Sequence, residues 1–205
     1  SMQGAFADPD KVTIVQVAPA VRSAWAEELG LDREEATPGR LVAALKALGF
    51  DYVFDTDFGA DLTIMEEGSE FLERMRHRED YTFPMFTSCC PGWVRFLKSQ
   101  YPEMIGQLST AKSPHQMQGA VTTTYRAEKF GLDPDQVYNV SVMPCIAKKK
   151  EAEIPNINDS GHGRDVDLVL TTREIARMIR ADHLDVKHLP EEEFDDPFGV
   201  SSGAG

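Results

Sequence analysis

The sequence has few cysteines and no long apolar run. Only three of its 205 residues are cysteine, and two of them, Cys89 and Cys90, are adjacent, so reduced thiols are expected rather than a disulfide framework. No apolar stretch approaches the roughly 18 residues that a membrane span requires. Residues 1–10 lack the basic region and apolar core of a signal peptide. These absences favour a cytoplasmic protein, and a periplasmic location stays open if the natural protein is exported with a partner subunit.

Basic residues are scarce relative to acidic ones. The chain has 21 Lys and Arg against 34 Asp and Glu, which gives a formal net charge of −13. Such a charge argues against non-specific binding to nucleic acid and against docking on anionic membranes. With 41% hydrophobic residues, the chain has enough apolar material for one large domain or two small lobes.

Short β-branched runs alternate with helical patterns along the whole chain. This alternation predicts an α/β fold with mainly parallel sheets flanked by helices. Proline or threonine at the start of several helical patterns marks their first turns, and Thr171 with Glu174 forms a capping box. The predicted strands cover 11–17, 51–55, 137–142 and 165–170, and the predicted helices cover 20–29, 38–47, 59–78, 91–100, 113–130, 146–153 and 172–180.

Three predicted turns share a proline next to the turn and a helix immediately after it. They are Ala18–Pro19, Cys90–Pro91 and Pro144–Cys145. Ligands bind at the carboxyl ends of parallel strands, and helix N-termini stabilise thiolates and other anions. We therefore hypothesise that the three turns converge on one site.

The spacing of the cysteines alone leaves their chemistry open. Two buried structural cysteines would explain Cys90 and Cys145, because buried cysteine is common. A structural zinc site would require closely spaced pairs of ligands, which the sequence lacks. A Cys–His nucleophile is also available, because His115 follows a Ser-Pro turn, although nothing else in the sequence supports that pairing.

Two cysteine motifs, taken together, resemble those of a known enzyme family. Phe86–Trp93 reads FTSCCPGW and Met143–Glu151 reads MPCIAKKKE. The pair resembles the first two signature segments of the catalytic domain of iron-only (FeFe) hydrogenases. Further matching segments make the resemblance cover nearly the whole chain. They are APAVR at Ala18–Arg22, DLTIMEEGSE at Asp61–Glu70, AKSPHQM at Ala111–Met117 and FDDPFGVSSGAG at Phe194–Gly205.

The resemblance implies a cofactor and a role for each cysteine. Members of the family bind the H-cluster, a 4Fe–4S cubane joined through a cysteine sulfur to a di-iron centre carrying CO and cyanide. They interconvert dihydrogen with protons and electrons, with ferredoxin or a similar electron carrier as partner. By resemblance Cys90 and Cys145 are ligands of the cubane, because iron–sulfur clusters are held by thiolates. Cys89 is the thiol that carries protons to the di-iron centre.

The resemblance also implies cofactor contacts around the cysteines. Lys148 would hydrogen-bond a cyanide ligand, Met143 and Pro144 would pack on the di-iron centre, and Ala18 and Pro19 would line the pocket. Without the resemblance, the basic run that contains Lys148 is typical of a solvated helix face, and Met143 is typical of ordinary core packing.

A proton relay is implied on the long predicted helix. By resemblance Glu67, Glu70 and Arg74, together with Ser109, carry protons from the surface to Cys89. Amphipathicity points the other way, because the three helical residues lie opposite an apolar stripe and would face water as an ordinary ion pair. A helix covered on both faces would reconcile the two readings. The residues of the apolar stripe are Leu62, Met65 and Leu72.

The third signature segment of the family, with two further cysteines, is missing. With two of four cubane ligands, we expect a C-terminally truncated fragment that is inactive alone and completed by the missing portion of the same enzyme. The predicted lobes are 1–87 (a partial first lobe), 88–199 (a second lobe) and 200–205 (a return to the first lobe). Exposed surfaces predict a homo-oligomer. The alternative is a non-catalytic iron–sulfur assembly or hydrogen-sensing relative.

Overall fold

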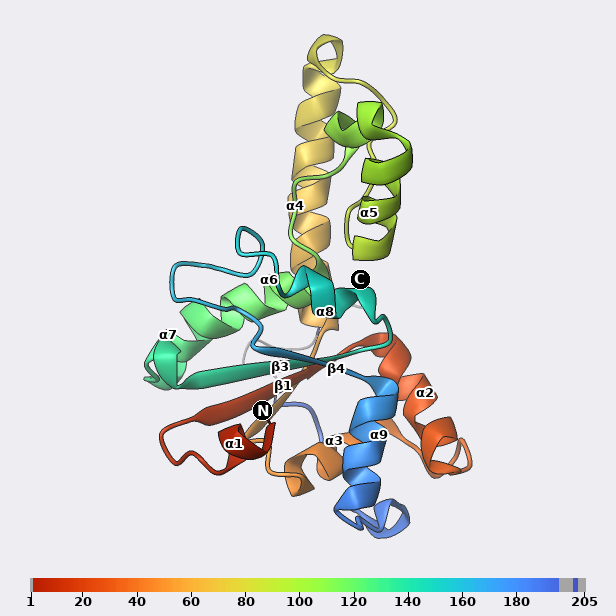
Figure 1. Cartoon of the computed structure of the whole chain (residues 1–205), viewed down its shortest axis with the longest axis vertical. Helices are drawn as coiled ribbons and strands as arrows, with labels where there is room; N and C mark the ends of the chain where they lie inside the picture. The colour runs from red at the N-terminus through yellow and green to blue at the C-terminus, as the bar shows by residue number, and fades with distance from the viewer. Residues whose placement is uncertain (1, 196–200, 203–205) are drawn as a thin grey trace.

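A four-stranded parallel sheet is the centre of the computed structural model, which describes residues 2–195 and 201–202 (Figure 1). Its strands follow the order β2-β1-β3-β4. Within it Val15 pairs with Val53 on one side and with Val140 on the other. The predicted α/β fold with a mainly parallel sheet flanked by helices is therefore confirmed. The strands are β1 (Val12–Val17), β2 (Tyr52–Asp55), β3 (Val137–Met143) and β4 (Leu168–Thr171).

The two faces of the sheet pack against different helices. Successive side chains of a strand point to opposite faces, so Val15 and Val17 enter a large apolar core that contains Trp25 and Ile175. That core lies under α2 (Pro19–Leu29), α3 (Pro38–Ala47) and α9 (Thr172–Ala181). On the other face, Ile14 packs with residues of α7 (Ala127–Phe130) in a smaller cluster. Alternating apolar residues thus place a helix layer on each face (Figure 1).

Most helix starts lie within one residue of the predicted ones, and the helix predicted over 59–78 begins two residues earlier, at Asp57. Proline is the first residue of α2, α3, α5 (Pro91–Gln100) and α6 (Pro114–Val121). At α3 the Thr37 side chain accepts a hydrogen bond from Arg40 N. At α9 the predicted capping box between Thr171 and Glu174 is present in both directions. These local signals are confirmed. They can be read from the sequence because a cap depends only on residues of one turn.

The predicted helix over 113–130 contains a π-helical turn. It runs as α6, then η3 (Thr122–Arg126), then α7. The Thr123 and Thr124 hydroxyls donate to carbonyls of the preceding turn, and such bonds compete with the regular backbone ladder. The π turn places the buried Arg126 guanidinium 4.2 Å from the centre of the Phe54 ring. A cation over an aromatic face on the sheet side stabilises this irregular turn.

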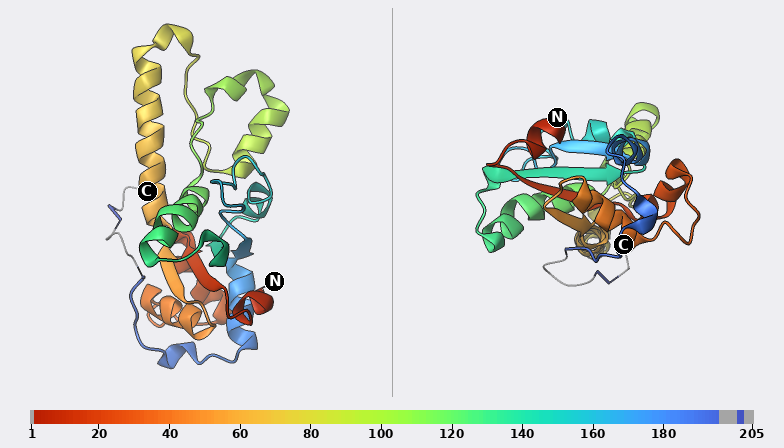
Figure 2. Two further views of the ribbon diagram at one scale, coloured as in Figure 1. Left: turned by 90° about the vertical axis from the view of Figure 1, so that its left-hand side faces the viewer. Right: turned by 90° about the horizontal axis from the view of Figure 1, so that it is seen from below.

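Helix α4 (Asp57–Arg76) leaves the end of β2 and projects away from the sheet (Figures 1 and 2). It crosses α6 at Gly59, where a Cβ atom would overlap the carbonyl oxygen of Pro114 and lie 2.8 Å from the Cβ of Gln118. Only glycine permits this approach. Residues 57–112, which we call the arm, also contain η1 (Arg78–Asp80), α5 and η2 (Pro102–Gln107).

The sheet takes strands from both sides of the predicted lobe boundary at residues 87 and 88. Strand β1 pairs with β3 over six residues, from Val12 with Val137 to Val17 with Val142. The division into lobes stays a prediction, and the predicted return over 200–205 lies mostly outside the described residues. The remaining short elements are α1 (Met2–Phe6), η4 (Pro134–Gln136), α8 (Ala147–Glu151) and η5 (Val186–His188). Within the described part of the chain, no helix is long and apolar enough to cross a bilayer.

Candidate functional site

The loop that carries the adjacent cysteines is held by a short pairing with the segment before α6. Phe86 N donates to Gln107 O at 2.8 Å, and Ser109 N donates back to Phe86 O at 2.7 Å. Two residues further, Ser88 Oγ donates to Ala111 O at 3.2 Å. These bonds fix the backbone immediately before Cys89, so the arm and not the sheet positions this loop.

The two adjacent cysteines have different surroundings. Cys90 is the N-cap of α5, and its Sγ accepts a hydrogen bond from Trp93 N at 3.4 Å. Cys89 lies one residue earlier, outside the helix. Cys145 lies between β3 and α8 and is partly exposed. All three are free thiols, as predicted.

Lys148 joins the two cysteine segments. Its Nζ donates to the Cys89 carbonyl oxygen, and at 3.0 Å to Oε2 of Glu151 in the same helix. Lys148 is buried, so its ammonium group requires a nearby negative charge, which Glu151 supplies. The solvated-face interpretation is therefore wrong for Lys148. It holds for Lys150, which is exposed and pairs with Glu153.

The predicted pocket residues lie at the carboxyl edge of the sheet. Ala18, directly after β1, is buried and donates from its N to Val142 O of β3 at 3.1 Å. Met143 is buried at the end of β3, whereas Pro19 and Pro144 are exposed. Two of the three predicted turns are thus neighbours at this edge, and Lys148 links them to the third. The cofactor contacts of these residues stay predictions.

The four predicted relay residues are brought together at the base of the cysteine loop. Arg74 Nη2 and Nε donate to Glu70 Oε1 at 2.5 and 3.1 Å. Glu70 Oε2 accepts from Ser109 Oγ at 3.1 Å. Glu67, one turn earlier on α4, accepts from Ser88 N at 3.4 Å, next to Cys89. Their roles in proton transfer stay a prediction, but their assembly on one side of α4 is observed.

The electrostatics of this group differ between its two ends. Burial raises the pKa of the Glu70 carboxyl, but the Thr110 N–H, Arg74 and Ser109 outweigh it and hold that pKa below its ordinary value. Removal from water raises the pKa of the Cys89 thiol, Glu67 and Cys90 raise it further, and Lys148 opposes them. Glu70 is therefore an ionised carboxylate and Cys89 a protonated thiol at neutral pH.

The exposure of α4 is the reverse of what its amphipathic pattern predicts. Arg74 is 4% exposed, whereas Met65 is 68% and Leu72 56% exposed. The interpretation of Glu70 and Arg74 as an ordinary surface pair is wrong, because residues 106–110 cover that face. Arg74 donates to the carbonyls of Gly106 and Leu108 there. Contacts more than 30 residues apart in the chain override the local pattern.

Sequence reasoning missed one buried polar group beside the site. His115 does not pair with a cysteine. Its Nε2 lies 2.5 Å from Glu151 Oε2 and its Nδ1 lies 3.0 Å from Ser141 Oγ. Ser113 Oγ donates to the same Glu151 oxygen at 2.9 Å. The position of Glu151 three residues after Lys148 was the available signal, because residues i and i+3 share a helix face.

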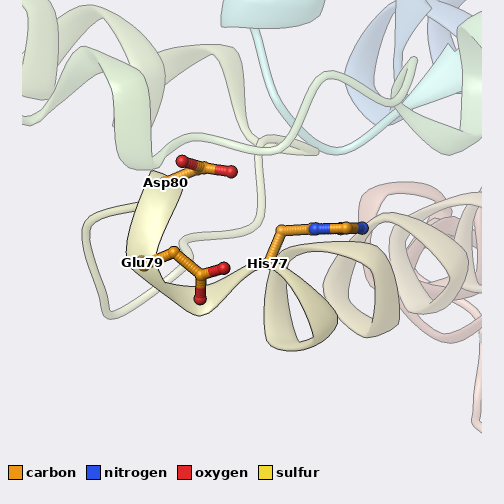
Figure 3. A group of neighbouring side chains, drawn as sticks. All are labelled: His77, Glu79 and Asp80. Atoms are coloured by element: carbon orange, nitrogen blue, oxygen red, sulfur yellow. The ribbon is translucent and has the colours of Figure 1, made fainter.

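A second group of possible metal ligands lies at the outer end of α4. His77, Glu79 and Asp80 are exposed, and their ligand atoms lie within 4.8 Å of one another (Figure 3). The imidazole Nε2 of His77 also contacts Glu73 at 3.2 Å. Exposed acidic groups of this kind are common in solvated helix ends, and this one lies apart from the cysteines.

The chain matches one family model over residues 11–205, described as iron only hydrogenase large subunit, C-terminal domain. It is 52% identical over 204 residues to the NADP-reducing hydrogenase subunit HndD of Solidesulfovibrio fructosivorans, covering 98% of this chain and 35% of that protein. It is also 35% identical over 197 residues to the cytosolic Fe-S cluster assembly factor narfl of Danio rerio, covering 94% of this chain and 48% of that protein.

Solved structures with the same fold are also similar in sequence. The apo form of the hydrogenase HydA1 from Chlamydomonas reinhardtii, variant C377H, superposes with a TM-score of 0.88 at 47% identity. The match covers 99% of this chain and 53% of that one. The chain thus spans about a third to a half of the length of these relatives.

Proposed function

The chain belongs to the iron-only hydrogenase large-subunit family, and from that premise we propose that it forms part of a subunit that interconverts dihydrogen with protons and electrons. Ferredoxin or a similar carrier would exchange the electrons. The chain alone would be inactive, because it supplies only part of the metal site. The single observation that supports this proposal best is the ionic face of α4, which turns inward to the cysteine loop instead of outward to water.

The cysteines of this chain are the right kind of ligand for the H-cluster, and they would supply two of the four thiolates that its cubane requires. Soft thiolates are the ligands that iron–sulfur clusters require, and four hold a cubane. Cys90 and Cys145 would fill two of those positions. The buried Lys148 ammonium beside them would stabilise anionic ligands of the cluster. When bound, the H-cluster, which is described for solved relatives, supplies the iron centre at which dihydrogen is formed or split.

The chain's own residues would move protons between solvent and this centre. Cys89 holds a proton on Sγ at neutral pH, because its pKa is raised. The carboxylate of Glu67 is close by, since it accepts a hydrogen bond from the N–H of Ser88, the residue before Cys89. Glu70 is ionised and can accept a proton, while Arg74 and Ser109 fix its two oxygens. The hydrogen-bonded pair Glu70 and Ser109, together with Glu67, would form the path for protons to Cys89, because each of these side chains can accept and donate a proton.

A second candidate function is non-catalytic iron–sulfur assembly, favoured by the 35% identity to the assembly factor. Such a protein needs cluster ligands but no proton path. The hydrogen bonds of Arg74 would hold the arm in either protein, but a row of titratable groups, Glu70 and Glu67 next to the Cys89 thiol, has a chemical role only in proton transfer. These residues therefore discriminate between the two candidates, and they support the hydrogenase.

Turnover of the complete, cluster-loaded subunit tests the proposal. Glu67→Gln removes a titratable group of the path and is expected to lower hydrogen evolution from a reduced viologen dye by about 100-fold or more. Glu66→Gln is the matched control, because Glu66 is its exposed neighbour on α4 and is expected to leave the rate unchanged. Full activity of the Glu67 variant would overturn the relay, and no activity in the unaltered loaded subunit would favour the assembly function.

A further inference from the structure

We propose that His115 is a positioning residue that holds Glu151 and, through it, sets the place of the Lys148 ammonium group against the cysteine loop. The benefit to the metal site rests on the proposed function. The positioning itself does not, because it concerns only side chains of this chain. Three elements meet here, namely α6, α8 and strand β3.

One oxygen atom is the centre of the group. Glu151 Oε2 accepts from Lys148 Nζ at 3.0 Å, from Ser113 Oγ at 2.9 Å and from His115 Nε2 at 2.5 Å. Glu151 is 4% exposed and His115 1% exposed. Bonds to an ionised acceptor are about twice as strong as neutral ones, so three donors around one buried oxygen leave the carboxylate a single position.

The imidazole is oriented by the sheet. His115 Nδ1 faces Ser141 Oγ of β3 at 3.0 Å. Its backbone oxygen accepts from Nε2 of Gln16, a buried residue of β1, at 3.0 Å. Burial lowers the pKa of His115, so the ring is neutral. Nε2–H therefore donates to Glu151, and the Ser141 hydroxyl donates to Nδ1. His115 is thus held by strands β1 and β3, and it in turn fixes the position of the Glu151 carboxylate on α8.

Lys148 depends on this carboxylate for its place. A lysine side chain is a flexible stem with a point charge at its end, so acceptors and not packing determine where the ammonium lies. Two of its three N–H groups go to Glu151 and to the Cys89 carbonyl. Among the residues that the structure describes, the third N–H has no acceptor, which leaves it for a ligand at the cysteine site. Loss of the His115 bond would loosen Glu151 and with it the link between α8 and the cysteine loop.

Lysine-selective NMR on the full chain, without cluster, tests the positioning directly. In the unaltered chain the Lys148 ammonium protons are expected to exchange slowly with water. Glu151→Gln removes the counter-charge and His115→Leu removes one donor, and each is expected to speed exchange by about tenfold or more. His115→Gln keeps an N–H donor and is expected to restore slow exchange. Glu153→Gln, on an exposed neighbour paired with Lys150, is the matched control and should change nothing at Lys148.

The outcomes separate positioning from packing. Slow exchange in His115→Leu, or equal defects in His115→Leu and His115→Gln with native circular dichroism, would overturn the proposal. If His115→Leu does not fold, the comparison of Glu151→Gln and His115→Gln decides it. In the complete loaded subunit, His115→Leu should shift the infrared cyanide bands and His115→Gln should not; unshifted bands in both would also count against it. A subunit that takes up no cluster would overturn the proposed function and leave the NMR result standing.

Discussion

The sheet and helix α4 of the arm differ in which side chains they bury. The central strands bury aliphatic residues such as Val15, Val53 and Val140 between two helix layers. In the arm, α4 buries Arg74 and places Met65 and Leu72 outside. The sheet is therefore stabilised chiefly by apolar burial, whereas the inner face of α4 is held to the cysteine loop by an ion pair and hydrogen bonds. On α4, the inner face that would ordinarily carry apolar side chains instead carries Arg74 and its partner Glu70.

The exposed apolar face of the arm bears on how the chain associates. Ile64, Phe71 and Met75 lie on α4 beside Met65 and Leu72, and all five are exposed. Contiguous apolar patches of this kind are typical of surfaces that contact other protein. The predicted homo-oligomer and the predicted contact with a missing portion of the same enzyme stay predictions.

The largest effect is expected from a substitution where α4 of the arm crosses α6 beside the sheet. Gly59→Ala places a methyl group against the backbone of α6 and should destabilise the protein by about 3 kcal/mol. Gly68→Ala, in the same helix with open space around it, should instead stabilise it by about 1 kcal/mol. Thermal unfolding measures both. A similar effect of the two substitutions would contradict the close crossing of α4 over α6.

A somewhat smaller effect tests the inverted faces of α4. Arg74→Leu removes the donor of Glu70 Oε1 and of two carbonyl groups and should cost about 2 kcal/mol despite adding an apolar residue. Met65→Ser on the outer face should change the free energy of unfolding by less than about 0.5 kcal/mol. Denaturant titration measures the two free energies. A greater loss in Met65→Ser would show that the amphipathic pattern of the sequence is right and that this face is the buried one.

The smallest effect is a difference in pH dependence between the two regions. The pKa of Glu70 in the arm is lowered from 4.5, so its contribution to stability is present above pH 4.5 and is lost as the pH falls. The pKa of Asp167, next to β4, is raised from 3.8 because burial outweighs its hydrogen bond from Asn139 N. Its contribution is therefore greatest below pH 3.8 and is lost as the pH rises.

Two substitutions measure these opposite signs. Glu70→Gln should flatten the loss of stability in acid, and Asp167→Asn should raise stability at neutral pH relative to acid. Thermal unfolding followed from pH 3 to pH 7 gives both slopes. Relative to the unaltered chain, the slope of stability against pH should fall in Glu70→Gln and rise in Asp167→Asn; changes of the same sign would contradict the difference between arm and sheet.

The predictable parts of the fold are those that depend on short stretches of sequence. The β-branched runs, the prolines at helix starts and the Thr171–Glu174 capping box give the strands and helices of the sheet, because each signal acts within one turn or one strand. The parallel arrangement followed from the alternation of strands and helices, but the strand order did not. The π turn at 122–126 was not predicted, because the contact of Arg126 with Phe54 that stabilises it joins residues distant in the sequence.

The site was predictable in its residues but not in its contacts. The cysteine motifs and their resemblance to the family pointed to Cys89, Cys90 and Cys145. The burial of Arg74 and the pairing of His115 with Glu151 join residues more than 30 positions apart. A local pattern gives at most the i, i+3 pair of Lys148 and Glu151. The burial of Arg74 and the partner of His115 depend on segments that are distant in the sequence and meet only in the fold.

Counting iron most directly tests the central claim, that adjacent cysteines divide metal binding and proton transfer between them. The complete subunit would be reconstituted without oxygen, and iron and sulfide would be measured per chain in three variants. Cys90→Ala and Cys145→Ala are expected to lose most of the bound cluster, whereas Cys89→Ala should keep the full amount and lose hydrogen evolution. Loss of iron in Cys89→Ala, or its full retention in Cys90→Ala, would contradict this division.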